Sequence, residues 1–198
     1  SKWQAEHTKM DTVANAQGFI TVHPQGIENA EGDTGWNAEI CCRGWHKENV
    51  DDVAFVTALL DDLEVRYSID TKRVFAAGMS NGGFFAYHLA CTLADRIAAI
   101  GSVAGLRNPQ CSPSAVVSAL HFHGTADDIV RYDGVPNEDN QMGDDIWLDA
   151  DSSVRGLAEA AGCGPLEEIV LSRDDVTCVS WSGCDDAQVA FTLCTVEG

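Results

Sequence analysis

The segment Gly78-Met79-Ser80-Asn81-Gly82 has the residue types and the spacing of a strained turn that carries a nucleophile. It follows the apolar run 73–77, and a helix-like pattern begins directly after it. In a strand–turn–helix of this kind the serine takes a strained backbone conformation, and glycines two residues to either side avoid clashes. Ser80 would then project above the sheet edge at the positive end of the helix. The alternative is an ordinary glycine-rich turn.

Two aspartates are candidates for the acid that such a serine needs. A serine hydroxyl becomes a good nucleophile only when a base removes its proton and an acid orients that base. In this kind of fold the three residues follow the chain order serine, acid, histidine. The segment 123–128 comes directly after the apolar run 115–122 and supplies the acid. Asp127 is favoured over Asp128, and either carboxylate would otherwise cap a turn.

The base is missing from its expected place, because no histidine follows Asp127. His88 lies about 12 Å along the helix from Ser80, too far to reach the hydroxyl. His46 lies on a long loop and is a minor alternative. An acyl transfer also needs two N–H donors for its oxyanion; Asn81 supplies one, and no His-Gly loop precedes Ser80 to supply the other. The remaining histidines are His7, His23, His121 and His123.

Apolar periodicity predicts the elements that would position these residues. A helix with Asn49 as its N-cap and an apolar stripe from Val53 to Tyr67 precedes the Ser80 strand. Further helices are expected from Gly83 to about 94 and over about 152–161. Strands are expected over 97–103 and 115–124 and near residues 170 and 189. Strands that alternate with helices predict an α/β fold with a mostly parallel sheet covered on both faces.

The N-terminal part predicts a helix over 3–16 and a buried strand over 18–24 that ends at Pro24. A long loop over 25–48 follows and carries the Cys41-Cys42 pair. The length of 198 residues fits a single domain over 1–198. Ligands in parallel sheets bind beyond the carboxyl ends of the strands, where Pro24, Ser80 and the Asp127 segment are all expected.

The net charge and the cysteine content limit which binding partners and which cellular compartment are expected. The net charge of −19 argues against nucleic acid and anionic membrane surfaces as partners. The apolar runs are too short to span a bilayer. The eight cysteines are scattered without a Cys-x-x-Cys pair, which favours disulfides in an oxidising, secreted or periplasmic setting. Nothing in the residues calls for a cofactor or a metal.

An ordered set of motifs runs through nearly the whole chain. The motifs are Trp36-Asn37-Ala38, Cys41-Cys42, Val50-Asp51-Asp52-Val53, Gly78-Met79-Ser80-Asn81-Gly82-Gly83, Ser102-Val103-Ala104-Gly105, His123-Gly124-Thr125-Ala126-Asp127 and Gly183-Cys184-Asp185. Together they resemble the secreted polyhydroxybutyrate depolymerase and feruloyl esterase family, which includes carbohydrate esterases that act on xylan. The resemblance implies an α/β-hydrolase fold and a serine esterase that hydrolyses feruloyl, acetyl or hydroxybutyrate esters of polyesters or plant polysaccharides through an acyl-enzyme.

The resemblance also implies roles for single residues. Ser80 would be the nucleophile, Asp127 the acid, and Asn81 a donor of one oxyanion N–H. Trp36 and Asn37 would lie close to the substrate pocket. Gly78 and Gly82 would be the glycines of the turn, and Cys163 and Cys184 would form a disulfide.

Family members place the catalytic histidine in a Gly-Gly-His-x-Trp-Pro segment just after a strand that ends in Val-Glu-Gly or similar. This chain ends at Thr195-Val196-Glu197-Gly198, and the family's His-Gly loop would lie a few residues before Ser1. The resemblance therefore predicts a domain that is incomplete at both ends and a fragment that is inactive by itself.

The missing histidine and several residue clusters allow other interpretations of the chain. A non-catalytic hydrolase-fold protein could bind a polymer or partner through its aromatic loop. His121 and His123 share a strand face and could hold a metal, although packing and hydrogen bonding at the strand end is the simpler role. An acidic cluster could bind calcium or form a solvated surface; its members are Asp144, Asp145, Asp149 and Asp151. Four aromatic residues could stack on a substrate or pack in the protein: Trp36, Trp45, Trp147 and Tyr132.

Overall fold

Apolar segments of the second half of the chain form a six-stranded mixed sheet in the order β3-β4-β5-β8-β7-β6. The structure, a computed structural model, describes residues 2–29, 32–42, 50–134 and 148–198. The chain divides into two compact units, Ser1–Trp36 and Asn37–Gly198. The sheet belongs to the second unit.

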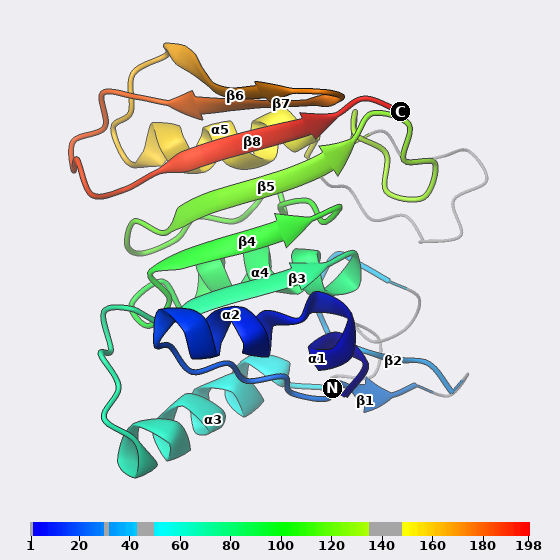
Figure 1. Cartoon of the computed structure of the whole chain (residues 1–198), viewed down its shortest axis with the longest axis vertical. Coiled ribbons are helices and arrows are strands. Elements are labelled where there is room, and N and C mark those ends of the chain that lie inside the picture. Colours follow the sequence, from blue (N-terminus) through cyan, green and yellow to red (C-terminus); the bar gives the residue numbers. More distant parts are fainter. Residues whose placement is uncertain (1, 30–31, 43–49, 135–147) are drawn as a thin grey trace. The chain divides into compact units, whose positions relative to one another are not determined.

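Four parallel strands make up the part of the sheet that carries the candidate site. They are β3 (Phe75–Met79), β4 (Ala99–Val103), β5 (Ser118–Gly124) and β8 (Phe191–Val196). All four point toward the same edge, with Met79 beside Val103 and Val103 beside Phe122 (Figure 1). The sheet continues through an antiparallel hairpin of β7 (Val176–Trp181) and β6 (Glu167–Arg173).

Two helices cover one face of this sheet and bury its core. Helix α4 (Asn81–Thr92) packs on β3 and β4, and α5 (Ala150–Ala160) packs on β5 and β8 (Figure 1). The largest fully buried side chains of this unit include Tyr87, Phe84, Phe191, Leu106, His121 and His123. The predicted α/β fold with a mostly parallel sheet is therefore confirmed, and the cover predicted on its second face stays a prediction.

The helix before the Ser80 strand, α3, spans Asp52–Arg66. Its N-cap is Asp51, whose carboxylate accepts a hydrogen bond from the backbone N–H of Ala54. The predicted cap, Asn49, lies outside the described residues. An aspartate serves well here because its charge also interacts favourably with the positive end of the helix.

The C-terminal strands differ from the prediction. Two strands were expected near residues 170 and 189, but three form, and β7 was not predicted. The strand expected near Val189 begins at Phe191. In β7, Thr177, Cys178 and Ser180 interrupt the apolar residues, so the strand shows little periodicity by itself. It forms because β6 and β8 supply hydrogen-bonding partners on both sides.

The first unit is helical and then extended. Helices α1 (Lys2–Thr8) and α2 (Met10–Gln17) replace the single helix predicted over 3–16, because Lys9 takes a left-handed conformation between them. Gly18, also left-handed, ends α2. Two-residue strands β1 (Ile27–Glu28) and β2 (Thr34–Gly35) form a short antiparallel pair.

The buried strand predicted over 18–24 does not form. Phe19, Ile20 and Val22 are 45%, 55% and 43% exposed, and Pro24 does not end a strand. The side chains of Thr21 and His23 both hydrogen-bond the carboxylate of Asp11 instead. An apolar run becomes a strand only when it joins a sheet, and neither sheet in the described part of the chain includes residues 18–24.

Four disulfides join the cysteines: Cys41–Cys42, Cys91–Cys111, Cys163–Cys184 and Cys178–Cys194. The predicted pairing of Cys163 with Cys184 is confirmed. It ties the end of α5 to the segment that follows β7. The Cys91–Cys111 bond ties α4 to the loop after β4.

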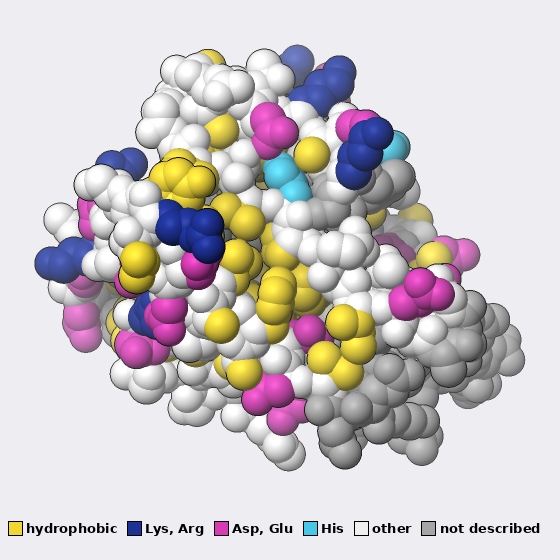
Figure 2. Space-filling model, turned by 90° about the horizontal axis from the view of Figure 1, so that it is seen from below, with side chains coloured by type: hydrophobic (Ala, Val, Ile, Leu, Met, Phe, Trp, Pro, Cys, Tyr) yellow, Lys and Arg dark blue, Asp and Glu magenta, His cyan; other side chains and the backbone are white. Residues whose placement is uncertain are grey.

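The surface fits the acidic composition. On the face shown in Figure 2, acidic side chains are scattered among basic and apolar ones rather than gathered in one patch. This distribution is typical of a solvated surface. Within the described residues, the helices are all too short or too polar to cross a membrane.

Candidate active site

Ser80 occupies the junction between β3 and α4 in a strained conformation, as predicted. Its φ of 52° and ψ of −122° lie outside the regions that non-glycine residues favour. Backbone hydrogen bonds hold it there: its N–H donates to the carbonyl of Val103 at 2.8 Å, and its own carbonyl accepts from Gly83 and Phe84. The turn is therefore anchored to β4 on one side and to the helix on the other.

The glycines around the turn have unequal roles. A Cβ at Gly78 would overlap the backbone of Gly82, so the need for glycine at 78 is confirmed. A Cβ at Gly82 would meet no described atom within 4 Å, so the steric requirement predicted there is wrong. The close approach occurs one residue later: a Cβ at Gly83 would lie 2.7 Å from the Ser102 hydroxyl oxygen, and one at Gly105 would overlap the Gly83 backbone.

The pair Gly83 and Gly105 was missed as a positioning element. Their contact lets the first turn of α4 sit directly against the end of β4, which fixes the direction of the helix below Ser80. The hydroxyl of Ser102 supports this contact by donating to the Gly105 carbonyl at 2.8 Å. The doublet Gly82-Gly83 and the segment Ser102-Val103-Ala104-Gly105 were the available signal in the sequence.

Asn81 is the first residue of α4. The first N–H groups of a helix point out of its N-terminus and carry its partial positive charge. The backbone N–H of Asn81 therefore lies on the element that would stabilise a negative charge next to Ser80.

Asp127 lies on the loop that leaves β5, and the loop is built around its carboxylate. Oδ1 accepts the backbone N–H of Ile129 at 3.0 Å and that of Val130 at 2.9 Å. Oδ2 lies 3.8 Å from Nε2 of His123. The Asp127 side chain is only 23% exposed, whereas Asp128 is exposed. Asp127 therefore caps the turn of this loop, which is the alternative role named for either aspartate, and its role as the acid stays a prediction.

The sheet brings Ser80 and Asp127 to one edge. Ser80 follows the last residue of β3, and Asp127 follows the last residue of β5 by three positions. Only β4 lies between the two strands, so their ends are about 10 Å apart. The end of β8 lies beside β5, where Val196 pairs with Gly124 (Figure 1).

The described histidines of this unit have partners other than Ser80. His88 faces Glu39, with Nδ1 3.5 Å from a carboxylate oxygen. His121 and His123 are buried behind the sheet edge and hydrogen-bond each other at 3.0 Å. No described histidine hydrogen-bonds the hydroxyl of Ser80, and His46 lies outside the described residues.

Asn37 fixes the loop that leads to α3. Its backbone N–H donates to the buried carboxylate of Asp52 at 2.7 Å, and its side-chain amide donates to the carbonyl of Val50 at 2.8 Å. Its side-chain oxygen accepts the N–H of Glu39. Both polar atoms of the side chain are therefore used within the protein, which is the pattern of a positioning residue.

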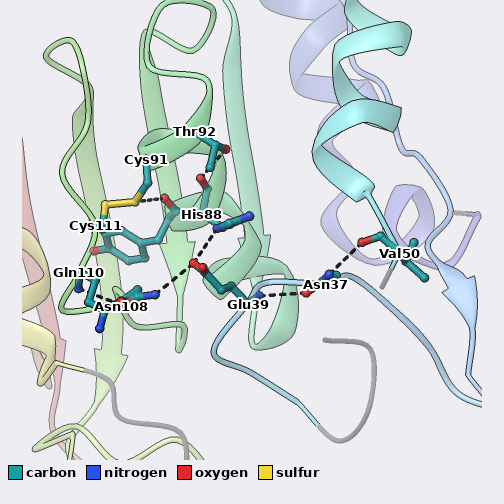
Figure 3. Close-up of polar contacts among 10 residues, drawn as sticks. Asn37, Glu39, Val50, His88, Cys91, Thr92, Asn108, Gln110 and Cys111 are labelled. Atoms are coloured by element: carbon teal, nitrogen blue, oxygen red, sulfur yellow. Dashed lines mark hydrogen bonds and ion pairs between the residues drawn. A yellow bond between two sulfur atoms is a disulfide. The ribbon is translucent and has the colours of Figure 1, made fainter. Parts of the chain in front are cut away.

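Glu39 connects this loop to two other segments. Its carboxylate lies between His88 on α4 and Asn108 on the loop after β4, as Figure 3 shows. Burial lowers the pKa of His88, and the nearby carboxylates of Glu39 and Asp51 oppose that effect. His88 thus belongs to a surface network rather than to the turn at Ser80.

The other residues singled out in the sequence have structural roles where they are described. Tyr132 packs edge-on against His123 and hydrogen-bonds Thr195 at 2.9 Å. Asp149 caps α5, and Asp151 pairs with Arg155. Trp36 is half-buried and follows β2 in the first unit. Trp45, Trp147, Asp144 and Asp145 lie outside the described residues, and no group of three or more metal-ligating side chains gathers within the described part.

Comparison with known proteins points to one class of enzyme. The chain is 33% identical, over 67% of its length, to a bifunctional acetylxylan esterase/xylanase from Neocallimastix patriciarum. It is 27% identical, over 100% of its length, to feruloyl esterase B from Piromyces equi. It is also 33% identical, over 63% of its length, to a probable feruloyl esterase C from Aspergillus flavus. The chain is related to carbohydrate esterases.

The likeness covers only part of each relative. The chain spans 18%, 36% and 47% of the three relatives in the order given above. No family model matches the chain.

Proposed function

We propose that the chain belongs to a serine ester hydrolase that acts on feruloyl or acetyl esters of plant polysaccharides. The observation that carries the proposal is the backbone of Ser80, held at φ 52° between a parallel strand and a helix. A strained serine at this junction is the arrangement that exposes a nucleophile above a sheet. The names of the relatives supply the ester classes.

In the proposed reaction the Ser80 oxygen attacks the ester carbonyl while a histidine base, which the described residues do not supply, takes the hydroxyl proton. The negative charge on the carbonyl oxygen is stabilised by the N–H of Asn81 at the start of α4. The alcohol leaves with the proton, and water then releases the acid from the acyl-enzyme. Asp127 orients the base and stabilises its charged form.

The disulfides and the net charge agree with a secreted enzyme that acts on polysaccharide esters. Four disulfides are typical of proteins made for an oxidising compartment, which supports secretion. The net charge of −19 disfavours polyanionic partners such as nucleic acids. An ester attached to a neutral or weakly charged polysaccharide carries no such penalty.

The test compares the full-length wild-type protein with its Ser80→Ala variant on methyl ferulate, an aryl acetate and a hydroxybutyrate ester. Loss of at least about a thousandfold in kcat is expected, because removal of a nucleophile abolishes acyl-enzyme formation. Ser112→Ala, at an exposed serine, is the control and should keep full activity. Unchanged hydrolysis by Ser80→Ala would refute the proposal.

The acid is tested by a matched pair of neighbours. Asp127→Asn should lower kcat by about 10⁴-fold, since an amide orients the base wrongly. Asp128→Asn removes the same charge one residue away, from an exposed side chain, and should have little effect. Equal losses in the two variants would show that charge near the site, rather than the Asp127 carboxylate, matters.

A further inference from the structure

A line of buried polar groups lies directly behind the loop that carries Asp127. The Tyr87 hydroxyl is 2.9 Å from Nδ1 of His121, and Nε2 of His121 is 3.0 Å from Nδ1 of His123. Nε2 of His123 is 2.7 Å from the carbonyl oxygen of Val130. The three side chains are at most 1% exposed. The line therefore joins α4, through β5, to the end of the Asp127 loop.

The carbonyl at the end of this line determines the direction of every hydrogen bond in it. A carbonyl oxygen only accepts, so Nε2 of His123 carries a proton. In a neutral imidazole the other nitrogen is then an acceptor, so Nε2 of His121 donates to Nδ1 of His123. By the same step Nδ1 of His121 accepts from the Tyr87 hydroxyl.

The surroundings favour the neutral forms of His121 and Tyr87. Burial, and then the proximity of His123, lower the pKa of His121 to about 3. Burial also raises the pKa of Tyr87, which keeps its hydroxyl protonated.

Val130 is the point where this line meets the candidate acid. Its carbonyl accepts from His123, and its N–H donates to Oδ1 of Asp127 at 2.9 Å. Holding Val130 in place therefore holds the carboxylate. At the other end, Tyr87 lies on the helix that begins directly after Ser80. The line connects the element that carries the nucleophile with the loop that carries the acid.

We propose that His123 is a positioning residue, whose Nε2–H holds Val130 and thereby fixes the Asp127 carboxylate relative to α4, with Tyr87 and His121 setting its tautomer. The proposal rests on the proposed function for the role of Asp127. The competing role is space-filling in the core, since the two imidazoles also stack with ring centres 5.3 Å apart.

The first test needs no substitution. Long-range ¹H–¹⁵N spectra of the wild-type protein should show both His121 and His123 as neutral Nε2–H tautomers at neutral pH. A doubly protonated His123, or an Nδ1–H tautomer at either residue, would overturn the proposal, because the direction of the line would then be reversed or broken.

The second test uses two amides that mimic different halves of the imidazole. In His123→Gln the amide nitrogen can occupy the Nε2 position and keep the bond to Val130. In His123→Asn the side chain reaches only the Nδ1 position, so that bond is lost. Exchange of the Ile129 and Val130 backbone amides should be about tenfold faster in the Asn variant than in the Gln variant. His88→Gln, on the same helix as Tyr87 but outside the line, should leave both amides unchanged.

Kinetics then link the geometry to the reaction. The Asn variant should lose about tenfold in kcat with KM unchanged, and the Gln variant should keep most of its kcat, because the acid acts on the base and not on substrate binding. Equal exchange in the two variants, or equally faster exchange at the core amides of Ile100 and Leu193, would overturn the positioning role. Amide exchange decides this even if Ser80→Ala shows that the esterase proposal is wrong.

Discussion

The buried imidazole of His121 makes the stability of the protein sensitive to acid. Its pKa falls from an ordinary 6.5 to about 3 in the folded state, first because burial disfavours the imidazolium and then because His123 is adjacent. Between these values the unfolded chain takes up a proton that the folded protein does not. The contribution of His121 to the free energy of unfolding is therefore fully present above pH 6.5 and is lost as the pH falls toward 3.

The size of the effect follows from the same two values. They differ by about 3.5 pH units, and each unit is worth about 1.4 kcal/mol, so the full loss is about 5 kcal/mol. At pH 4 about 3 kcal/mol of this is lost relative to pH 7. Domains of this size have total stabilities of about 5–15 kcal/mol, so one side chain decides a large part of the acid response.

The assay is urea unfolding followed by circular dichroism at pH 7, 6, 5 and 4, for the wild-type protein and for His121→Gln. The variant breaks the hydrogen-bonded line and is expected to be less stable at pH 7, but it lacks the titrating group. Its stability should fall by about 3 kcal/mol less than that of the wild type between pH 7 and 4. His88, whose pKa is also lowered, contributes equally to both proteins and cancels. Parallel pH curves for the two proteins would refute the reasoning.

Two further predictions concern close packing at glycines. Gly105→Ala should destabilise the protein by about 1–3 kcal/mol in chemical unfolding because its Cβ overlaps Gly83. Gly82→Ala should cost no stability and can gain up to about 1 kcal/mol from helix propensity. Equal losses of stability in the two variants would contradict the steric argument. Gly156→Ala should cost about 1–3 kcal/mol because its Cβ overlaps the buried guanidinium of Arg107. Adding Arg107→Met should relieve that overlap, so the double variant should lose less than the two single losses together; additive losses would rule out the contact as the cause.

Local patterns predicted much of the sheet and of the turn. The strand before Ser80 and the helix after it were visible because an apolar run, glycines and a helical pattern follow in immediate succession. The position of Asp127 directly after a strand was visible because an apolar run precedes it, and its role as the acid stays a prediction. These features depend on neighbours within a few residues, which is the range over which sequence patterns are informative.

Other features depended on distant partners and were missed. The apolar run 18–24 joins neither sheet in the described part of the chain, whereas β7 forms from a weak pattern because two strands pair with it. The roles of Gly82 and Gly83 were confused because only the position of Gly105, more than 20 residues away, shows which of the two must lack a side chain.

The sequence by itself determined the turn at Ser80, the aspartate that follows β5 and the alternation of strands and helices, since each is encoded in consecutive residues. The tertiary structure alone decided what His121 and His123 do. In the sequence they are two histidines on one strand face, for which packing is the simpler role and a metal site the weaker alternative. Only the placement of Tyr87 and of the Val130 carbonyl at either end makes them a directed line of hydrogen bonds, because the direction of each bond depends on an acceptor elsewhere in the fold.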